Sequence, residues 1–350
     1  MAHYDDLGEA LAAPDDVTSL ELVGDGLHVE PLCLGSECSA FVRLERLEIA
    51  NASPVRFAPG LRLPRLKTLL LGDVRFEAWP EAISSFDALE RLEMAAPRRN
   101  ATLPGSVERL QNLRRLKLYG FAALCPELAS LRRLVELDLS WNRLTDLGPV
   151  WRMPWLERLD LSANPLPAIP PQIANLQRLQ RLVCDGDARA GRRGPGRELG
   201  ARAGVVGEIP AALCTLPALR ELSLCQQRVR RVAPRVAELT ALRCLRLAGN
   251  ALASVPPELF ALSGLVELDL GHNRLASLPE DLARLRSLEV LALHGNPLAR
   301  LPDALAALPA LRRLKLWERR LPASERERLR RLLPEGVVGT DEGGGGRTEG

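Results

Sequence analysis

Aromatic side chains are scarce in this sequence of 350 residues. Tryptophan, tyrosine and phenylalanine make up 4% of the chain, whereas hydrophobic residues as a whole make up 46%. The core must therefore be aliphatic, mostly leucine. The chain also lacks an apolar run near the roughly 18 residues of a membrane span, and its start lacks the basic and apolar regions of a signal peptide. Its seven cysteines are odd in number and scattered, which favours a reducing compartment. We therefore expect a cytoplasmic protein.

Catalytic signatures are missing as well. The sequence contains no phosphate-binding G-x-x-x-x-G-K-[ST], no zinc-protease H-E-x-x-H, no nucleophile-elbow G-x-S-x-G and no C-x-x-C. Only four histidines are available for acid–base chemistry. We predict no enzymatic activity, no cofactor and no metal.

Neither positive nor negative charge predominates, because the chain carries 47 basic residues and 44 acidic ones. The basic surplus is concentrated in residues 188–206, which carry five arginines against one glutamate: Arg189, Arg192, Arg193, Arg197 and Arg202. A chain without an overall basic bias has no general attraction for nucleic acid. We therefore do not expect nucleic acid as its main partner.

Leucine, by contrast, recurs with a fixed period of 23 residues. In the unit that starts at Leu265, apolar residues occupy positions 4, 6, 11, 14, 18 and 21, Asn273 occupies position 9 and Pro279 position 15. Positions 4 and 6 alternate with polar neighbours as in a strand, and positions 14, 18 and 21 follow helical spacing. Counting weaker copies upstream, units start at Val17, Leu44, Leu66, Leu89, Leu113, Leu134, Leu156, Leu179, Leu219, Leu242, Leu265, Leu288 and Leu311.

This pattern resembles the leucine-rich repeat family, L-x-x-L-x-L-x-x-N-x-L. The period and the Leu/Val-Pro at positions 14–15 are similar to the subclass in plant intracellular Ras-group-related and Scribble-type proteins. The resemblance implies an α/β solenoid, a horseshoe of about 13 repeats with a parallel sheet on the concave face and turns and short helices on the convex face. A single repeat cannot bury enough apolar surface to fold alone, so stacking of neighbours must supply the core.

The domain organisation follows from the limits of the repeat. We expect a helical cap at 1–16, started by Asp5 or Asp6, and a solenoid at 17–322 with an insertion at about 188–206. Ser324 and Glu327 have the spacing of a capping box and predict a C-terminal capping helix at 323–334. Residues 335–350 contain four consecutive glycines and are predicted to be disordered.

Function in such a fold is expected on concave strand positions 3, 5, 7 and 8. Tyr119 and Trp141, on adjacent repeats, are predicted to form one exposed patch that anchors a partner, although packing is the alternative. Opposite charges are predicted to pair on neighbouring strands, as Arg115–Glu136–Arg158 and Lys117–Asp138, which is also compatible with a merely solvated surface. The predicted binding residues are Tyr119, Trp141, Lys117, Asp138, Arg158, Asp160, His272, His294 and Trp317.

Three groups have weaker interpretations. His272 and His294 lack a third strong ligand, so a metal site is not favoured. Cys33 and Cys38 are expected to be plain thiols and Cys184 a core residue. Cys225 and Cys244 should face the concave side, where a reactive thiol is an open alternative. The arginines of the insertion either dock an acidic partner or belong to a tolerated surface loop.

The sequence therefore predicts a monomeric, non-enzymatic scaffold that binds a partner protein through its concave sheet, in intracellular signalling by analogy with the family. Two alternatives remain. The chain could be the recognition arm of a separate kinase, GTPase or ubiquitin-ligase system. It could also bind an acidic polymer or nucleic acid through the arginine-rich loop.

Overall fold

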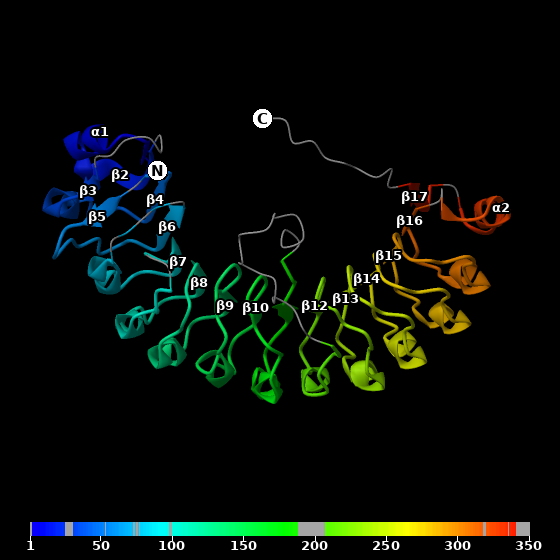
Figure 1. Cartoon of the computed structure of the whole chain (residues 1–350). Helices are drawn as coiled ribbons and strands as arrows, with labels where there is room; N and C mark the ends of the chain where they lie inside the picture. Colours follow the sequence, from blue (N-terminus) through cyan, green and yellow to red (C-terminus); the bar gives the residue numbers. More distant parts are fainter. Residues whose placement is uncertain are drawn as a thin grey trace, which may run out of the picture. The chain divides into compact units, whose positions relative to one another are not determined.

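The computed structural model describes residues 2–24, 31–52, 54–72, 74, 76, 78–97, 100–187, 207–317, 320–334 and 336–340. The chain divides into two compact units, Met1–Leu166 and Pro167–Gly350. In each unit, short strands line one side of successive coils and short 3-10 helices line the other (Figure 1). We call the strand side the concave face and the helix side the convex face.

The first unit holds a parallel sheet in the order β1-β2-β4-β6-β7-β8-β9-β10. Equivalent leucines, such as Leu92, Leu116 and Leu137, lie directly beside one another on neighbouring strands. A separate two-stranded sheet pairs β3 (Leu32–Leu34) with β5 (Val55–Phe57). The strands of the main sheet are β1 (Ala2–Tyr4), β2 (Val17–Val23), β4 (Arg46–Ala50), β6 (Thr68–Gly72), β7 (Arg91–Ala95), β8 (Arg115–Tyr119), β9 (Glu136–Asp138) and β10 (Arg158–Asp160).

The second unit repeats this arrangement with greater regularity. Leu245, Leu268 and Leu291 align in one row across its strands. The strands are β11 (Arg181–Val183), β12 (Glu221–Ser223), β13 (Cys244–Arg246), β14 (Glu267–Asp269), β15 (Val290–Ala292), β16 (Arg313–Leu316) and β17 (Val338–Thr340).

The convex segments are short 3-10 helices, and all of those named here except η8 begin at a proline or directly after one. In the first unit they include η3 (Glu81–Ser85), η4 (Gly105–Arg109), η5 (Pro126–Ser130) and η6 (Val150–Arg152). In the second unit they are η7 (Pro171–Asn175), η8 (Leu213–Thr215), η9 (Pro234–Glu238), η10 (Pro257–Ala261), η11 (Glu280–Arg284) and η12 (Asp303–Ala307). The tight 3-10 turn fits because only a few residues separate each convex leucine from the next strand.

The core is the continuous aliphatic interior between the two faces. Leu265, Leu268, Leu270, Leu282 and Leu285 of one repeat are all fully buried. Each such side chain contributes about 1.5–3 kcal/mol when removed from water, and each contacts its counterparts in the adjacent coils. The α/β leucine-rich repeat solenoid predicted from the period is confirmed.

The asparagine at position 9 joins consecutive coils. The side-chain amide of Asn273 donates to the carbonyls of Leu247, Leu270 and Gly271 at 2.9, 3.0 and 3.2 Å, and its oxygen accepts from the amide of Leu252 at 3.0 Å. Leu247 and Leu252 belong to the preceding repeat. Asn142, Asn164, Asn250 and Asn296 make the corresponding bonds in their repeats.

The N-terminal end carries more than the expected helix. Helix α1 (Leu7–Ala12) begins after Asp6, whose carboxylate accepts from the amide of Glu9 at 2.9 Å. In addition, β1 pairs in parallel with β2. The strand covers backbone groups that an edge strand would otherwise leave open.

Two expectations for the C-terminal end are wrong. Helix α2 (Ala323–Leu332) begins after Pro322 without any side-chain cap, so the Ser324–Glu327 capping box does not form. Residues 338–340, predicted to be disordered, form β17 and pair with β16. Val337 is buried at the start of this strand, which explains why the segment is held. Residues 341–350 lie outside the described part of the chain.

Candidate protein-binding surface

In eight repeats, the residue at position 8, which follows the strand, has a left-handed backbone. Three of these residues are glycines with φ of +69° to +82°: Gly120, Gly249 and Gly295. The others are L-residues with φ of +52° to +59°: Asn51, Trp141, Ala163, Gln226 and His272. An L-residue pays roughly 1–2 kcal/mol in this region, and bulky side chains are uncommon there. The two large rings at this position, Trp141 and His272, were both predicted to bind a partner.

Trp141 is the one large aromatic side chain with high exposure among the described residues, at 48%. Its amide donates to the carbonyl of Ser162 at 2.9 Å, and its own carbonyl accepts from the amide of Gly120 at 3.0 Å. The backbone is thus fixed between two neighbouring coils while the indole is half-accessible to solvent. This arrangement is suited to presenting an aromatic ring to a partner.

Tyr119 has a different environment from the one expected. It is half-buried, and its hydroxyl donates to the carbonyl of Leu71 at 3.1 Å. Because Tyr119 lies on β8 and Leu71 on β6, the side chain crosses β7, where its neighbour is the small Ala95. The two aromatic residues therefore do not form one equally exposed patch: Tyr119 rests against the sheet and Trp141 stands at its edge.

The concave charges of the first unit largely neutralise one another. Glu136 lies 3.5 Å from both Arg115 and Arg158, as predicted. Lys117 differs from the expectation: its Nζ lies 2.6 Å from Glu93 on the preceding strand rather than bonding Asp138. The hydrogen bond that Lys117 donates to the Glu93 carboxylate raises the pKa of Lys117.

Asp138 and Asp160 have a local structural role. Each carboxylate accepts from the backbone amide two residues later, from Ser140 at 2.9 Å and from Ser162 at 2.8 Å. These bonds shape the turn that leads into position 8. Of the predicted binding residues on this face of the first unit, Trp141 and Arg158 are the two with exposed side chains, and Arg158 is paired with Glu136.

In the second unit, an ion-pair chain crosses four strands. Glu221 lies 2.7 Å from both Arg181 and Arg246, and Arg246 lies 2.9 Å from Glu267. The Arg246 guanidinium lowers the pKa of Glu267. Paired surface charges contribute little to stability, but they define which charges remain for a partner.

The predicted group of His272, His294 and Trp317 is brought together. The ring of His272 lies 4.8 Å from that of His294 and 5.1 Å from that of Trp317, both edge-on, and the Arg320 guanidinium lies 4.4 Å over Trp317. A Cβ atom at Gly295 would lie 2.7 Å from the His272 ring. The glycine therefore provides the space that the ring occupies. Within the described residues, no group of three or more His, Cys, Asp or Glu is placed to hold a metal ion.

Burial makes the concave cysteines poor nucleophiles. It raises the pKa of Cys225 to about 11 and that of Cys244 to about 12. Because the thiolate is the reactive form, both thiols are almost fully protonated near neutral pH. Cys184 is buried, as predicted, Cys38 is buried too, and Cys33 is exposed.

We expect iodoacetamide at pH 7.5 to modify Cys33 first, and Cys225 and Cys244 at least about tenfold more slowly. Peptide mass spectrometry over a time course measures the three rates. Equal or faster labelling of Cys225 or Cys244 in the folded protein would restore the reactive-thiol alternative.

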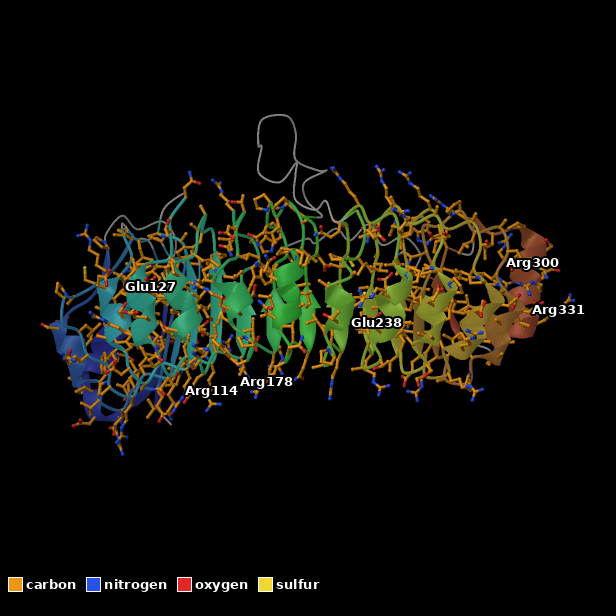
Figure 2. The ribbon with its side chains drawn as sticks, turned by 90° about the horizontal axis from the view of Figure 1, so that it is seen from below. Arg114, Glu127, Arg178, Glu238, Arg300 and Arg331 are labelled. Atoms are coloured by element: carbon orange, nitrogen blue, oxygen red, sulfur yellow. The ribbon has the colours of Figure 1, made fainter. Side chains whose placement is uncertain are left out.

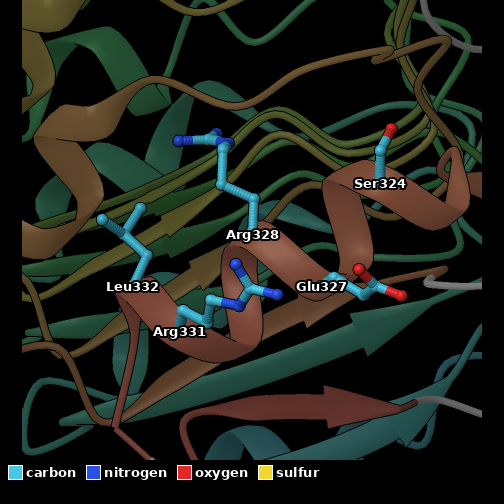
Figure 3. Close-up of a pocket in the computed structure, with 5 residues that line it drawn as sticks. All are labelled: Ser324, Glu327, Arg328, Arg331 and Leu332. Carbon is cyan, nitrogen blue, oxygen red and sulfur yellow. The ribbon is translucent and has the colours of Figure 1, made fainter.

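Two further regions carry no predicted chemistry here. The arginines of the insertion, residues 188–206, lie outside the described part of the chain. A shallow hollow of about 290 Å³ on α2 is lined by Ser324, Glu327, Arg328, Arg331 and Leu332 (Figure 3). It is bounded by one helix alone, so it lacks the converging walls of a ligand pocket.

Sequence comparison identifies leucine-rich repeats in parts of the chain. Models described as "Leucine rich repeat" match residues 240–298, 263–318 and 131–148. Comparison with curated proteins gives no match.

Solved structures with similar folds come from bacteria and plants. A leucine-rich repeat protein of Leptospira interrogans has a TM-score of 0.52 and 25% identity, covering 97% of this chain and 100% of its own. An internalin of Listeria monocytogenes has a TM-score of 0.55 and 18% identity, over 87% of this chain and 82% of its own. The ectodomain of a membrane receptor kinase of Arabidopsis thaliana, GASSHO1/SCHENGEN3, has a TM-score of 0.60 and 20% identity, over 90% of this chain and 43% of its own. This chain thus spans less than half of the receptor ectodomain.

These similarities establish the fold, and leucine-rich repeat domains of this fold are protein-interaction modules. In the described part of the chain, no helix has the length and hydrophobicity needed to cross a membrane.

Proposed function

We propose that this protein is a non-enzymatic scaffold that binds a partner protein through its concave face, with Trp141 as the principal anchor. The observation that carries the proposal is the backbone of Trp141. Three equivalent positions in other repeats use glycine, which adopts positive φ without steric cost, and three use Asn51, Ala163 and Gln226, whereas here a bulky and half-exposed indole occupies the position. Strained residues of this kind cluster at functional sites.

Tyr119 contributes beside Trp141, as the neighbouring aromatic side chain held against the sheet by its bond to Leu71. The ion pairs around Lys117 and Glu136 set the register of the partner, because complementary charges favour orientation and association rate more than affinity. The Arabidopsis ectodomain of the same fold was solved in complex with CASPARIAN STRIP INTEGRITY FACTOR 2. That complex supports a binding role by analogy of fold alone.

Several finer points are proposals that rest on the sequence. We place the repeats in the 23-residue subclass of the plant Ras-group-related and Scribble-type proteins, in a cytoplasmic, monomeric protein that acts in signalling. The alternatives are a recognition arm for a separate enzyme and an acidic-polymer binder that uses the arginine-rich loop. Partner purification from native cells distinguishes a protein partner from a nucleic acid.

Replacing Trp141 with glycine should separate binding from folding. We expect affinity for the purified partner to fall at least tenfold, or about 1.4 kcal/mol, while the free energy of unfolding changes by less than about 1 kcal/mol because the backbone strain is relieved. Isothermal titration and urea unfolding measure the two quantities.

Trp155→Ala provides the matched control. Trp155 lies outside the concave rows, where its indole donates to the carbonyl of Leu131 at 3.1 Å and its ring lies under Arg132. Its loss should destabilise the fold without changing affinity. Full affinity of Trp141→Gly for the partner would refute the anchor.

A further inference from the structure

Cations on the concave strands are, with two exceptions, paired with acids. Each of the following lies within 4.0 Å of a carboxylate oxygen: Arg46, Arg91, Arg115, Lys117, Arg158, Arg181 and Arg246. Arg313 and Lys315, both on β16, have no such neighbour among the described residues. These two cationic side chains therefore form no direct ion pair within the described residues, although Lys315 is close enough to Glu267 to help lower the pKa of that carboxyl.

The sequence of the neighbouring strand explains the difference. The residues of β15 that align with Arg313 and Lys315 are Val290 and Ala292, where other strands of this unit carry acids such as Glu221 and Glu267. Arg313 is exposed and Lys315 half-exposed. The neighbouring strand therefore offers no counter-charge to Arg313 and Lys315.

The same strand leads into the ring cluster. Trp317 follows Lys315 by two residues, and Arg320 lies over its ring at 4.4 Å. Arg320 also lines a hollow of about 470 Å³, whose other walls are Gly295, Asn296, Pro297, Leu298, Ala299 and Pro322. Arg320 forms no ion pair within the described residues. A row of cationic and aromatic groups thus runs from the start of β16 to the edge of a hollow.

We propose that this row, formed by Arg313, Lys315, Trp317 and Arg320, binds an extended acidic segment of a partner protein. The inference rests on the proposed role of the concave face in protein binding and adds the chemistry of the ligand. Alternate residues of an extended chain lie about 6.6–6.8 Å apart on one side, which is also the spacing of Arg313 and Lys315 on β16, and Trp317 comes directly after the strand. Acidic side chains at every second position would therefore meet the row in register.

An acidic polypeptide fits better than a nucleic acid. Glu267 and Asp269 lie on β14, one strand beyond β15, and Glu289 adjoins β15. A continuous phosphate backbone that extended across these strands would meet their carboxylates, whereas a segment parallel to β16 would not. The net charge of +3 also provides no general attraction for polyanions.

The test uses a fluorescein-labelled dodecapeptide of alternating glutamate and valine, with the glutamine–valine peptide as its uncharged counterpart. Fluorescence anisotropy measures binding to the full chain at 50 and 200 mM salt. The charge-reversal variant is R313E/K315E. Its matched control is R178E, because Arg178 is an exposed arginine of the same unit, outside the concave strand rows and at the edge seen in Figure 2.

We expect the wild type to bind the glutamate peptide at least tenfold more tightly than the glutamine peptide. R313E/K315E should lose at least tenfold in affinity for the glutamate peptide, and R178E less than twofold. If the double reversal does not fold by circular dichroism, R313Q/K315Q should still lose at least threefold. Equal binding of the two peptides, equal losses in R178E and R313E/K315E, or tighter binding of a labelled twelve-residue oligouridine than of the glutamate peptide would overturn the proposal.

The Trp141→Gly variant separates this inference from the proposed function. It should bind the glutamate peptide as the wild type does, because Trp141 lies in the first unit. Loss of probe binding in R313E/K315E together with unchanged partner binding by Trp141→Gly would therefore refute the Trp141 anchor and leave the acidic-segment site in place.

Discussion

Replacing Asn142 with alanine should destabilise the first unit by about 3–5 kcal/mol. The Asn142 amide donates to the carbonyls of Leu118 and Leu139 at 2.7 Å, and its oxygen accepts from the amide of Phe121 at 2.7 Å. Alanine leaves these buried groups without partners, at about 1–3 kcal/mol each. Since two of them belong to the preceding repeat, the substitution also weakens the coupling between coils on which a solenoid depends.

Urea unfolding followed by circular dichroism measures this effect. Asn112→Ala is the matched control, because the Asn112 amide donates to the carbonyl of Asp87 at 2.8 Å at the protein surface, where water can replace it. It should cost less than about 1 kcal/mol. Similar losses in the two variants would mean that the buried ladder does not hold the coils together.

Replacing Arg328 with alanine should lower the free energy of unfolding of the C-terminal end of the second unit by about 3–5 kcal/mol. This end should then unfold before the rest of the unit. Glu325 is 6% exposed, and its carboxylate accepts from the Arg328 guanidinium at 2.7 and 2.9 Å and from the amide of Leu301 at 2.9 Å. Arg328 also contacts Asp303 and the carbonyl of Leu301. Without the arginine, a buried carboxylate remains that lacks its main counter-charge.

The same pair predicts a pH dependence. The bond to Arg328 is the largest cause that lowers the pKa of Glu325. The stabilisation by this ion pair is therefore fully present above the pKa of Glu325 in the unfolded state, near 4.5. It disappears as the pH falls through the lower pKa of the folded state. In Arg328→Ala the stability should depend less on pH in this range.

Arg331→Ala is the control, because Arg331 is an exposed arginine on the same helix, beside Arg328 in Figure 3. Arg331→Ala should change the free energy of unfolding by less than about 0.5 kcal/mol and keep the wild-type dependence of stability on pH. Indistinguishable pH profiles for Arg328→Ala and the wild type would show that the ion pair does not stabilise the cap.

The period of leucine is sufficient to predict the fold. Leu265, Leu268 and Leu270 mark a strand because side chains alternate across it, and the asparagine recurs at position 9 because its side chain bonds the same backbone groups in each repeat. The convergence of His272, His294 and Trp317 also follows from their places at positions 8, 7 and 7 of three successive repeats. Such features are local to one repeat or one step along the stack, so a repeating sequence specifies them.

The remaining features depend on contacts that the repeat does not encode. Lys117 bonds Glu93 rather than Asp138 because both neighbouring strands offer an acid at the same row, and the Asp138 carboxylate is engaged with the amide of Ser140. Tyr119 reaches two strands away, which adjacency alone does not predict. The strands β1 and β17 lie outside the repeat and carry none of its signals.

The left-handed backbone at position 8 is not among the features predicted from the leucine period, although the sequence carries a signal for it. Glycine recurs at this position as Gly120, Gly249 and Gly295, and such a recurrence indicates a positive φ. Trp141 and His272 are unusual because they place large rings where three other repeats have glycine and three have the non-aromatic residues Asn51, Ala163 and Gln226. The glycine pattern, rather than the leucine pattern, therefore distinguishes these two residues from the other aromatic and histidine side chains.

Site-specific photo-crosslinking tests the central claim most directly. A benzoylphenylalanine is placed at position 141 on the concave face or at position 127, where Glu127 lies on the convex helix η5 (Figure 2), and both proteins are irradiated with the purified partner. We predict a crosslinked partner protein from position 141 and at most one-tenth of that yield from position 127. Equal yields from the two positions, or a crosslink from position 127 alone, would contradict binding through the concave face.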